Sequence, residues 1–186
     1  MPHIDVIQPE NAAGELKEIY DGLIKSRGKI AEVHKIQSLN PKTITDHMNL
    51  YMTIMFGKSP LKRVQREMIG VVVSNANDCE YCQVHHIEAV NNFWKDDERA
   101  AKLRLDYKTA DLSATDTALC DFAWELTKNP GITNQSDLTK PLKAAGLDDR
   151  SILDATLVIG YFNFVNRIVL GLGVALEEIP GGYKYE

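Results

Sequence analysis

Cysteine is scarce in this sequence, with only three in 186 residues. Three cysteines cannot form the framework of paired disulfides that stabilises small secreted proteins. Cys79 and Cys82 form a Cys-x-x-Cys pair, which in a reducing compartment is more often catalytic or metal-binding than structural. Cys120 lies apart, beside Leu119 and Phe122 in an apolar helical pattern, and we expect it to be a buried core thiol.

The sequence also lacks the marks of a membrane or secreted protein. The N-terminus has no basic stretch followed by an apolar run, so no signal peptide is visible. The most apolar stretch, residues 152–176, carries Asp154, Asn163, Asn166 and Arg167, and this polarity argues against a membrane span. We therefore expect a soluble, cytoplasmic protein with no membrane partner.

Basic clusters and cofactor fingerprints are missing too. The formal net charge is −5 and the basic residues are scattered, which argues against a nucleic-acid partner. No glycine-rich nucleotide- or flavin-binding fingerprint is present. We therefore expect no bound cofactor, and electrons that arrive through a partner protein or a small thiol.

Alternating strand patterns with hairpin turns are absent, whereas apolar residues recur at helical spacing along most of the chain. The composition is ordinary for a globular protein, with 44% hydrophobic residues, so we expect one all-α domain spanning residues 1–186. The last predicted helix, from Asp148 or Asp149 to about Leu176, is apolar nearly all round. Such a helix is central in its domain or buried between subunits.

The residues with the most distinctive chemistry surround the cysteine pair. At about 100° per residue, Cys79, Cys82 and His86 fall in one narrow sector of a helix, while Tyr81 and His85 point elsewhere. His86 follows Cys82 by one helical turn, so it can contact the Cys82 sulfur, take its proton and stabilise the thiolate. We expect Asp78 to cap this helix, which places Cys79 in the first turn, where the helix dipole lowers a thiol pKa.

A carboxylate completes the group. Glu67 lies in an apolar stripe eight residues before Asn75, and His86 lies eight residues after Asp78. If the two helices fold back on each other at this turn, both side chains lie about 12 Å from it. Glu67 can then orient His86 and raise its basicity, as a third group does in other activated nucleophile sites.

Two alternatives remain at this point. A zinc site could use Cys79, Cys82 and His86 with either His85 or Glu67, although a Cys-x-x-Cys inside a helix lacks the usual zinc knuckle. A non-catalytic redox sensor or disulfide-exchange subunit would keep the dithiol without turnover.

At these residues the chain resembles the alkylhydroperoxidase D-like, or carboxymuconolactone decarboxylase, family. The redox branch of that family has a Glu, eleven residues, Cys-x-x-Cys, three residues and then His, and the sequence matches this spacing at Glu67, Cys79, Cys82 and His86. The likeness is greatest to its peroxidase-related members and extends over most of the chain. Further matching segments are Leu50-Tyr51, Met55-Phe56-Gly57, Arg66-Glu67, Val72-Val73-Ser74, Asn77 and Tyr161 to Arg167.

The resemblance implies an all-helical bundle with the redox site on a helix hairpin, assembled as a trimer or a hexamer. It implies antioxidant activity, in which hydroperoxides are reduced at the cysteine pair and an external dithiol or protein reductant restores it. Cys82 would attack the peroxide, and Cys79 would close the disulfide and meet the reductant. Decarboxylase members lack the cysteine pair, which argues against lactone decarboxylation here.

One position departs from the family pattern. The best-known peroxidase member has a histidine between the cysteines that joins its proton relay, whereas this sequence has Tyr81. A phenol is a poor base at neutral pH. The resemblance therefore implies dithiol chemistry more directly than peroxidase turnover, with His85 as a partial substitute for the missing histidine.

Overall fold

The computed structural model describes residues 1–131, 136–178 and 180–183. In these ranges the chain forms helices and no strand, which confirms the all-α prediction. The helices are α1 (Gly14–Arg27), α2 (Glu32–Lys35), α3 (Pro41–Tyr51), α4 (Arg63–Ala76), α5 (Glu80–Trp94), α6 (Asp97–Leu105), α7 (Ala114–Lys128), α8 (Ser136–Ala144) and α9 (Asp149–Leu172). Three short helical turns, Pro9–Asn11, Met52–Phe56 and Tyr107–Thr109, complete the set.

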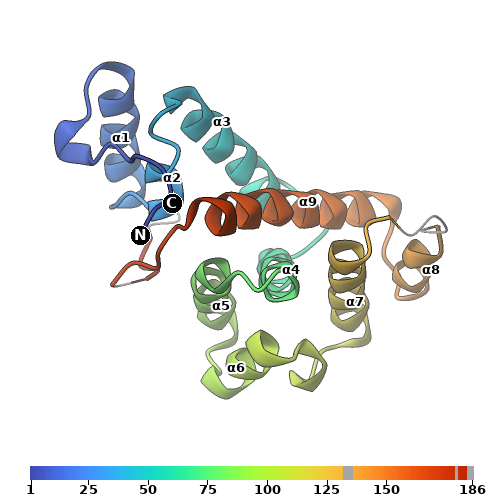
Figure 1. Cartoon of the computed structure of the whole chain (residues 1–186). Helices are drawn as coiled ribbons and strands as arrows, with labels where there is room; N and C mark the ends of the chain where they lie inside the picture. The colour runs from blue at the N-terminus through green and yellow to red at the C-terminus, as the bar shows by residue number, and fades with distance from the viewer. Residues whose placement is uncertain (132–135, 179, 184–186) are drawn as a thin grey trace.

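Helix α9 runs across the middle of the molecule, with α1, α2 and α3 on one side and α4 to α7 on the other (Figure 1). It packs against α2, α4, α7 and α8. Helix α4 lies beneath it and contacts α5, α6 and α7 as well, so residues 66–74 are all buried. Of the described helices, α4 is thus the one most enclosed by its neighbours, and it carries Glu67.

Close packing of α4 against α9 depends on Gly70. A Cβ atom at this position would lie 2.5 Å from the ring of Phe162, which is shorter than any real contact of this kind. The missing side chain leaves room for the tip of the Phe162 ring against α4. Phe162 is itself completely buried, so it fixes the distance between the two helices.

Helix α9 is also the described helix that is long and apolar enough to span a bilayer by length and composition. One face packs into the core and includes Asn166, which is fully buried and hydrogen-bonded. The opposite face leaves Leu153, Leu157 and Phe164 about half exposed. These features make α9 a core helix with one uncovered apolar face.

The termini of the helices follow the expected signals in two places. Asp148 caps α9 by accepting a hydrogen bond from the Ser151 amide, and Ser113 caps α7 in the same way.

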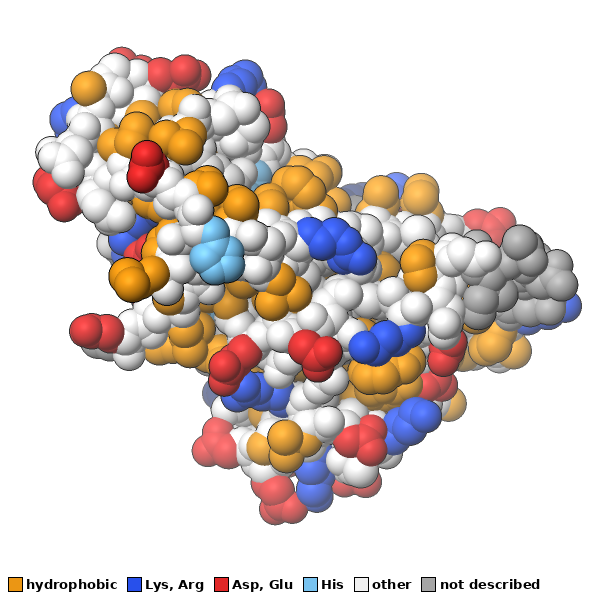
Figure 2. All heavy atoms as spheres, in the orientation of Figure 1, with side chains coloured by type: hydrophobic (Ala, Val, Ile, Leu, Met, Phe, Trp, Pro, Cys, Tyr) orange, Lys and Arg blue, Asp and Glu red, His pale blue; other side chains and the backbone are white. Residues whose placement is uncertain are grey.

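On the face shown in Figure 2, acidic and basic side chains are interspersed rather than gathered by sign.

Candidate active site

The candidate site is built on the hairpin between α4 and α5. Helix α4 ends at Ala76, Asp78 adopts the left-handed conformation at φ 55°, and Cys79 is the N-cap of α5. The expectation that Asp78 caps the cysteine helix is therefore wrong. Asp78 is used instead to reverse the chain, since aspartate tolerates the left-handed region better than most residues.

The hairpin brings Glu67 to His86, as their equal spacing from the turn predicts. His86 Nδ1 lies 2.6 Å from Glu67 Oε2, and Glu67 is fully buried. Arg63, one turn earlier on α4, binds Glu67 Oε1 through Nε at 2.7 Å and also through its terminal nitrogen. Burial alone would raise the pKa of Glu67, but His86 and Arg63 outweigh it and lower the pKa below its ordinary value.

This arrangement fixes the tautomer of His86. An ionised carboxylate can only accept hydrogen bonds, so His86 Nδ1 carries the proton and donates it to Glu67. In the neutral ring Nε2 is therefore unprotonated and able to take a proton from a neighbouring thiol. The edge of His86 contacts the Phe162 ring, with the ring centroids 4.5 Å apart, which holds the imidazole in place.

Both site cysteines are buried, with Cys79 0% and Cys82 2% exposed, and both are reduced. A hydrogen bond with the Cys82 thiol lowers the pKa of Cys79, although burial opposes the shift. The pKa of Cys82 is raised well above its ordinary value, because Cys82 shares its proton with Cys79 and is buried. The pair thus favours one thiolate and one thiol, with the first negative charge on Cys79.

Polar side chains from α4 and α9 surround the two sulfurs. Asn166 hydrogen-bonds to both cysteines, and Ser74 hydrogen-bonds to Cys82. Asn77 Nδ2 donates to Asn166 Oδ1 at 2.9 Å, and Asn166 Nδ2 donates to Ser74 Oγ at 3.2 Å. These contacts fix the Asn166 amide. One N–H of its Nδ2 goes to Ser74, so the other N–H is the one left to stabilise a thiolate at the cysteine pair.

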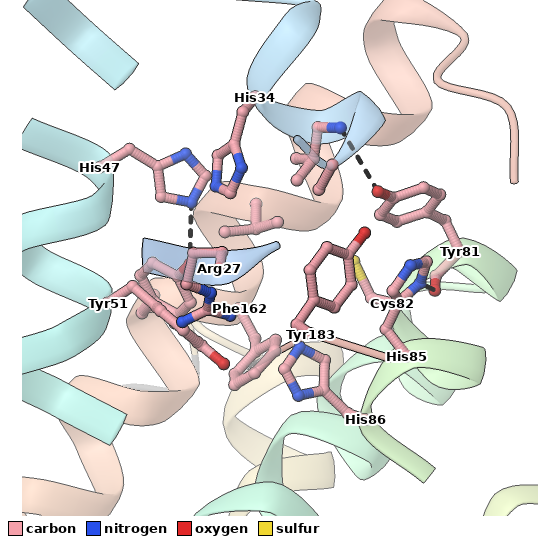
Figure 3. A pocket seen from close by; sticks show the side chains of 14 residues that line it. Arg27, His34, His47, Tyr51, Tyr81, Cys82, His85, His86, Phe162 and Tyr183 are labelled. Atoms are coloured by element: carbon pink, nitrogen blue, oxygen red, sulfur yellow. Dashed lines mark hydrogen bonds between the residues drawn. The ribbon is translucent and has the colours of Figure 1, made fainter. Parts of the chain in front are cut away.

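A pocket with a volume of about 70 Å³ opens at Cys82 and His86, and Cys79 is not part of its lining. Helix α2 contributes His34 and α3 contributes His47 to the wall opposite α5 (Figure 3). Since one water needs on the order of 10–15 Å³, the space suits a few waters or a small organic molecule. A substrate in this pocket reaches the sulfur of Cys82 before that of Cys79.

The expected direct contact between His86 and Cys82 is not made. In the described part of the chain no hydrogen bond joins them, and they instead face the same pocket. The hydrogen bond of His86 Nδ1 goes to Glu67 on α4 instead. Proton transfer between Cys82 and His86 therefore needs a water or a substrate oxygen in the pocket.

Tyr81 and His85 also line this pocket, so the expectation that they point away from the site is wrong. The Tyr81 hydroxyl donates to Glu177 Oε1 at 2.7 Å, and His85 Nε2 lies 3.0 Å from Glu177 Oε2. Their rings are stacked, with centroids 4.3 Å apart. The segment after α9 supplies Glu177 and closes this side of the pocket, which a helical wheel of α5 alone cannot show.

Tyr81 and Glu177 both have shifted pKa values. Burial and the charge of Glu177 raise the pKa of Tyr81 far above its ordinary value, so Tyr81 stays protonated. Burial opposes ionisation of Glu177, but the neighbouring His85 ring and hydrogen bonds from the Glu32 amide and the Tyr81 hydroxyl lower its pKa to about 2. Tyr81 therefore acts as a hydrogen-bond donor to a fixed carboxylate and not as a base.

The zinc alternative finds no support in this geometry. The described residues contain no group of three or more His, Cys, Asp or Glu side chains placed to hold a metal ion. Glu67 is occupied by Arg63 and His86, and His85 faces Glu177.

Several residues of the site were not found from the sequence. Arg63 and Ser74 share the helical face of Glu67, four residues before it and seven after it, so the spacing on α4 could have identified them. Asn166 was visible as a polar residue in an apolar helix. Nothing local to the sequence around Glu177 indicates its position over α5.

Comparisons with known proteins show what the chain is similar to. The family model described as the carboxymuconolactone decarboxylase family matches residues 41–123, which include Glu67, Cys79, Cys82 and His86. No curated protein matches the sequence.

Solved structures are similar over nearly the whole chain. An uncharacterised peroxidase-related protein from Silicibacter sp. TM1040 is 28% identical, with a TM-score of 0.82 over 95% of this chain and 94% of that chain. An uncharacterised peroxidase-related protein from Ralstonia eutropha JMP134, described as an alkylhydroperoxidase AhpD core, is 22% identical, with a TM-score of 0.84 over 95% and 93%. The debrominase Bmp8 shares the fold at 17% identity, with a TM-score of 0.76 over 93% and 91%. A model of the carboxymuconolactone decarboxylase family thus matches the part of the chain that carries the site, and the AhpD-like fold extends over nearly the whole chain.

Proposed function

We propose that this protein is a thiol-dependent, peroxidase-type oxidoreductase that reduces hydroperoxides with the Cys79–Cys82 pair. The observation that carries the proposal is the position of Cys82. It lines a small pocket together with His86, whose tautomer is fixed by Glu67, while Cys79 lies directly beside it outside the pocket. A nucleophile, a base, a group that orients the base and a resolving thiol are thus present in one site.

Each of the two thiols has one of the properties that the reaction needs, a lowered pKa or access to the pocket. Cys79 is the more acidic thiol, but Cys82 is the one that faces the pocket. His86 takes the first proton that the pair releases, and the remaining proton lies between the two sulfurs. When that proton moves to Cys79, Cys82 becomes the thiolate that faces the substrate.

The reaction then proceeds in two balanced steps. The Cys82 thiolate attacks the terminal oxygen of the hydroperoxide, the O–O bond breaks, and sulfur is oxidised to a sulfenic acid as the peroxide is reduced. The leaving oxygen takes up one proton, supplied overall by the proton that the cysteine pair gave to His86, and becomes an alcohol. The Cys79 thiol condenses with the sulfenic acid to form a disulfide and release water. An external dithiol or protein reductant restores the pair by thiol–disulfide exchange.

The proposed function also implies where the protein acts and how it assembles. We expect the protein to act in the cytoplasm, where reducing partners keep the pair available. We also expect it to assemble with copies of itself, as a trimer or hexamer, through the uncovered face of α9. Leu153, Leu157 and Phe164 recur there at helical spacing, and Gly160 between them would let a second helix approach closely.

A second candidate is a redox sensor or disulfide-exchange subunit without turnover. The observation that favours it is the burial of both sulfurs, since a reductant must reach them to close a catalytic cycle. Such a protein would be oxidised once and then remain oxidised until a specific partner bound.

Steady-state peroxide consumption separates these candidates. Purified protein is mixed with hydrogen peroxide and excess dithiothreitol, and the peroxide remaining is followed against time. The proposal predicts many peroxide molecules consumed per chain, and loss of this activity in Cys82→Ala. Consumption of a single equivalent per chain would instead identify the sensor, and no consumption above the dithiothreitol blank would exclude peroxide as a substrate.

A further inference from the structure

On the pocket wall opposite α5, a chain of hydrogen bonds fixes the direction in which the Tyr161 hydroxyl points. It begins at the backbone carbonyl of Val33, passes through Gln37 and His47, and ends at Tyr161 (Figure 3, dashed line from His47). None of these residues belongs to the redox motif. Each link determines the next, because each group can be assigned as a donor or an acceptor.

The first link fixes the amide of Gln37. Gln37 Nε2 lies 2.7 Å from the Val33 carbonyl oxygen, which can only accept a hydrogen bond. The flipped amide would place two oxygens against each other, so the nitrogen must face Val33. The same nitrogen lies 2.9 Å from His47 Nδ1 and donates to it.

The second link fixes the tautomer of His47. Nδ1 accepts from Gln37, and burial lowers the pKa of His47 to about 4, so the ring is neutral at pH 7. A neutral ring with an unprotonated Nδ1 carries its proton on Nε2. Nε2 lies 2.8 Å from the Tyr161 hydroxyl and therefore donates to the Tyr161 oxygen.

The third link leaves the Tyr161 proton without an acceptor. Its oxygen accepts from His47, and the described residues show no second hydrogen-bond partner for this hydroxyl. Tyr161 lines the pocket together with Cys82. By contrast, the hydroxyls of Tyr81 and Tyr183, in the same pocket, donate to Glu177.

We propose that Tyr161 is a catalytic residue that donates its proton to the oxygen that leaves when Cys82 attacks a hydroperoxide. This inference rests on the proposed function and supplies the general acid that the redox motif lacks. Burial, Tyr51 and Cys82 raise the pKa of Tyr161 well above its ordinary value, so the proton remains on the hydroxyl until a strong base forms beside it. A departing alkoxide or hydroxide is such a base.

The protons balance in this step. The S–O bond forms and the O–O bond breaks, and the leaving oxygen takes the Tyr161 proton. Tyr161 regains a proton from His86, through water in the pocket, and this is the proton that the cysteine pair gave up. The sum is one thiolate, one hydroperoxide and one proton giving a sulfenic acid and an alcohol.

The test compares leaving groups in Tyr161→Phe. Hydrogen peroxide expels hydroxide, which needs a proton, whereas peracetic acid expels acetate and iodoacetamide expels iodide, which do not. Loss of one such donor typically slows a reaction about 100-fold, so we expect that loss for oxidation of Cys82 by hydrogen peroxide. We expect less than about a threefold loss with the other two reagents.

Two further variants separate this role from a structural one. Gln37→Leu frees the tautomer of His47 and should lower the rate with hydrogen peroxide alone, by less than Tyr161→Phe does. Tyr107→Phe removes a comparable hydroxyl, which donates to Asp121 at 2.7 Å away from the pocket, and should leave all three rates unchanged.

The results separate a failure of the proposed role of Tyr161 from a failure of the proposed function. An equal loss with all three reagents, or no loss with hydrogen peroxide, would overturn the role of Tyr161 while the proposed function stood. A wild-type protein that reacts with iodoacetamide but not with either peroxide would overturn the proposed function and this inference together.

Discussion

Glu67 and His86 form a hydrogen bond of 2.6 Å across the α4–α5 hairpin, although Glu67 has no exposed surface. A carboxylate at such a depth persists only with partners, and Arg63 and His86 occupy its two oxygens. The pair is therefore a fixed part of the core that presents one nitrogen of His86 to the pocket.

Replacing the carboxylate tests this relationship. Glu67→Gln keeps the shape, but its single oxygen is needed to accept from Arg63, so its amide nitrogen faces His86 and donates to Nδ1. The ring proton of His86 then moves to Nε2, which can no longer accept a proton in the pocket. Loss of such an orienting group typically costs about 10–100-fold, so we expect that decrease in the rate of Cys82 oxidation by hydrogen peroxide. Stopped-flow measurement of thiol loss checks it, with Glu98→Gln, a largely exposed carboxylate on α6, as the control. A wild-type rate in Glu67→Gln would show that Glu67 has only a structural role.

Cys120 should take no part in the chemistry. It is fully buried, and burial raises its pKa far above the ordinary value for cysteine. We expect Cys120→Ala to keep the wild-type peroxide rate, with a stability loss of about 1 kcal/mol from the small cavity. Mass spectrometry after brief iodoacetamide treatment at pH 7 should find this thiol unlabelled in the folded protein. Labelling of Cys120 as fast as the pair would contradict its assignment.

The packing of α4 on α9 gives a stability prediction. In Gly70→Ala the new Cβ meets the Phe162 ring, so we expect a loss of about 1–3 kcal/mol in the free energy of unfolding. Gly22→Ala on α1 is the matched control, since Gly22 is exposed and a Cβ there meets nothing within 4 Å. The control should be neutral or more stable by up to about 1 kcal/mol, because alanine favours a helix. Urea unfolding measures both, and equal effects of the two substitutions would contradict the close contact.

The lowered pKa of His47 predicts how the free energy of unfolding depends on pH. Its pKa is lowered by burial to about 4 in the folded protein, whereas it is about 6.5 in the unfolded chain. Its contribution is therefore complete above about pH 6.5 and is lost as the pH falls toward about 4, because the unfolded state then binds the proton more readily. At pH 5 the loss is about 2 kcal/mol.

Urea unfolding at pH 7 and pH 5 checks this prediction. His47→Gln should show a smaller drop than wild type, while His3→Gln, at the exposed N-terminal segment, should show the same drop as wild type. The lowered pKa of Glu67 acts only at more acidic pH, below the ordinary carboxyl value, so it does not mask the effect. An equal drop in His47→Gln and wild type would contradict the assignment.

The parts of the site that the sequence predicts are those that one hairpin determines. Helical periodicity and distance from a single turn were enough to bring Glu67 to His86, because both helices continue without interruption for two turns. The role of Asp78 was missed because capping and left-handed turns favour the same residue types. The single domain expected over residues 1–186 stays a prediction.

The parts that were missed come from distant segments of the chain. Asn166 and Tyr161 reach the site from α9, His47 from α3 and Glu177 from the segment that follows α9. Their positions depend on how α9 crosses the hairpin, which depends in turn on contacts such as Gly70 with Phe162. No local pattern records those contacts, so a single sequence cannot place these residues.

The most direct test of the central claim is the product that each cysteine variant forms with one equivalent of hydrogen peroxide, measured by intact mass against time. Wild type should lose two thiols and form a Cys79–Cys82 disulfide. Cys79→Ser should gain one oxygen atom at Cys82, because no resolving thiol is present, and Cys82→Ser should react slowly. Oxidation of Cys82→Ser at the wild-type rate would contradict the account, since the attacking sulfur would then be Cys79, outside the pocket.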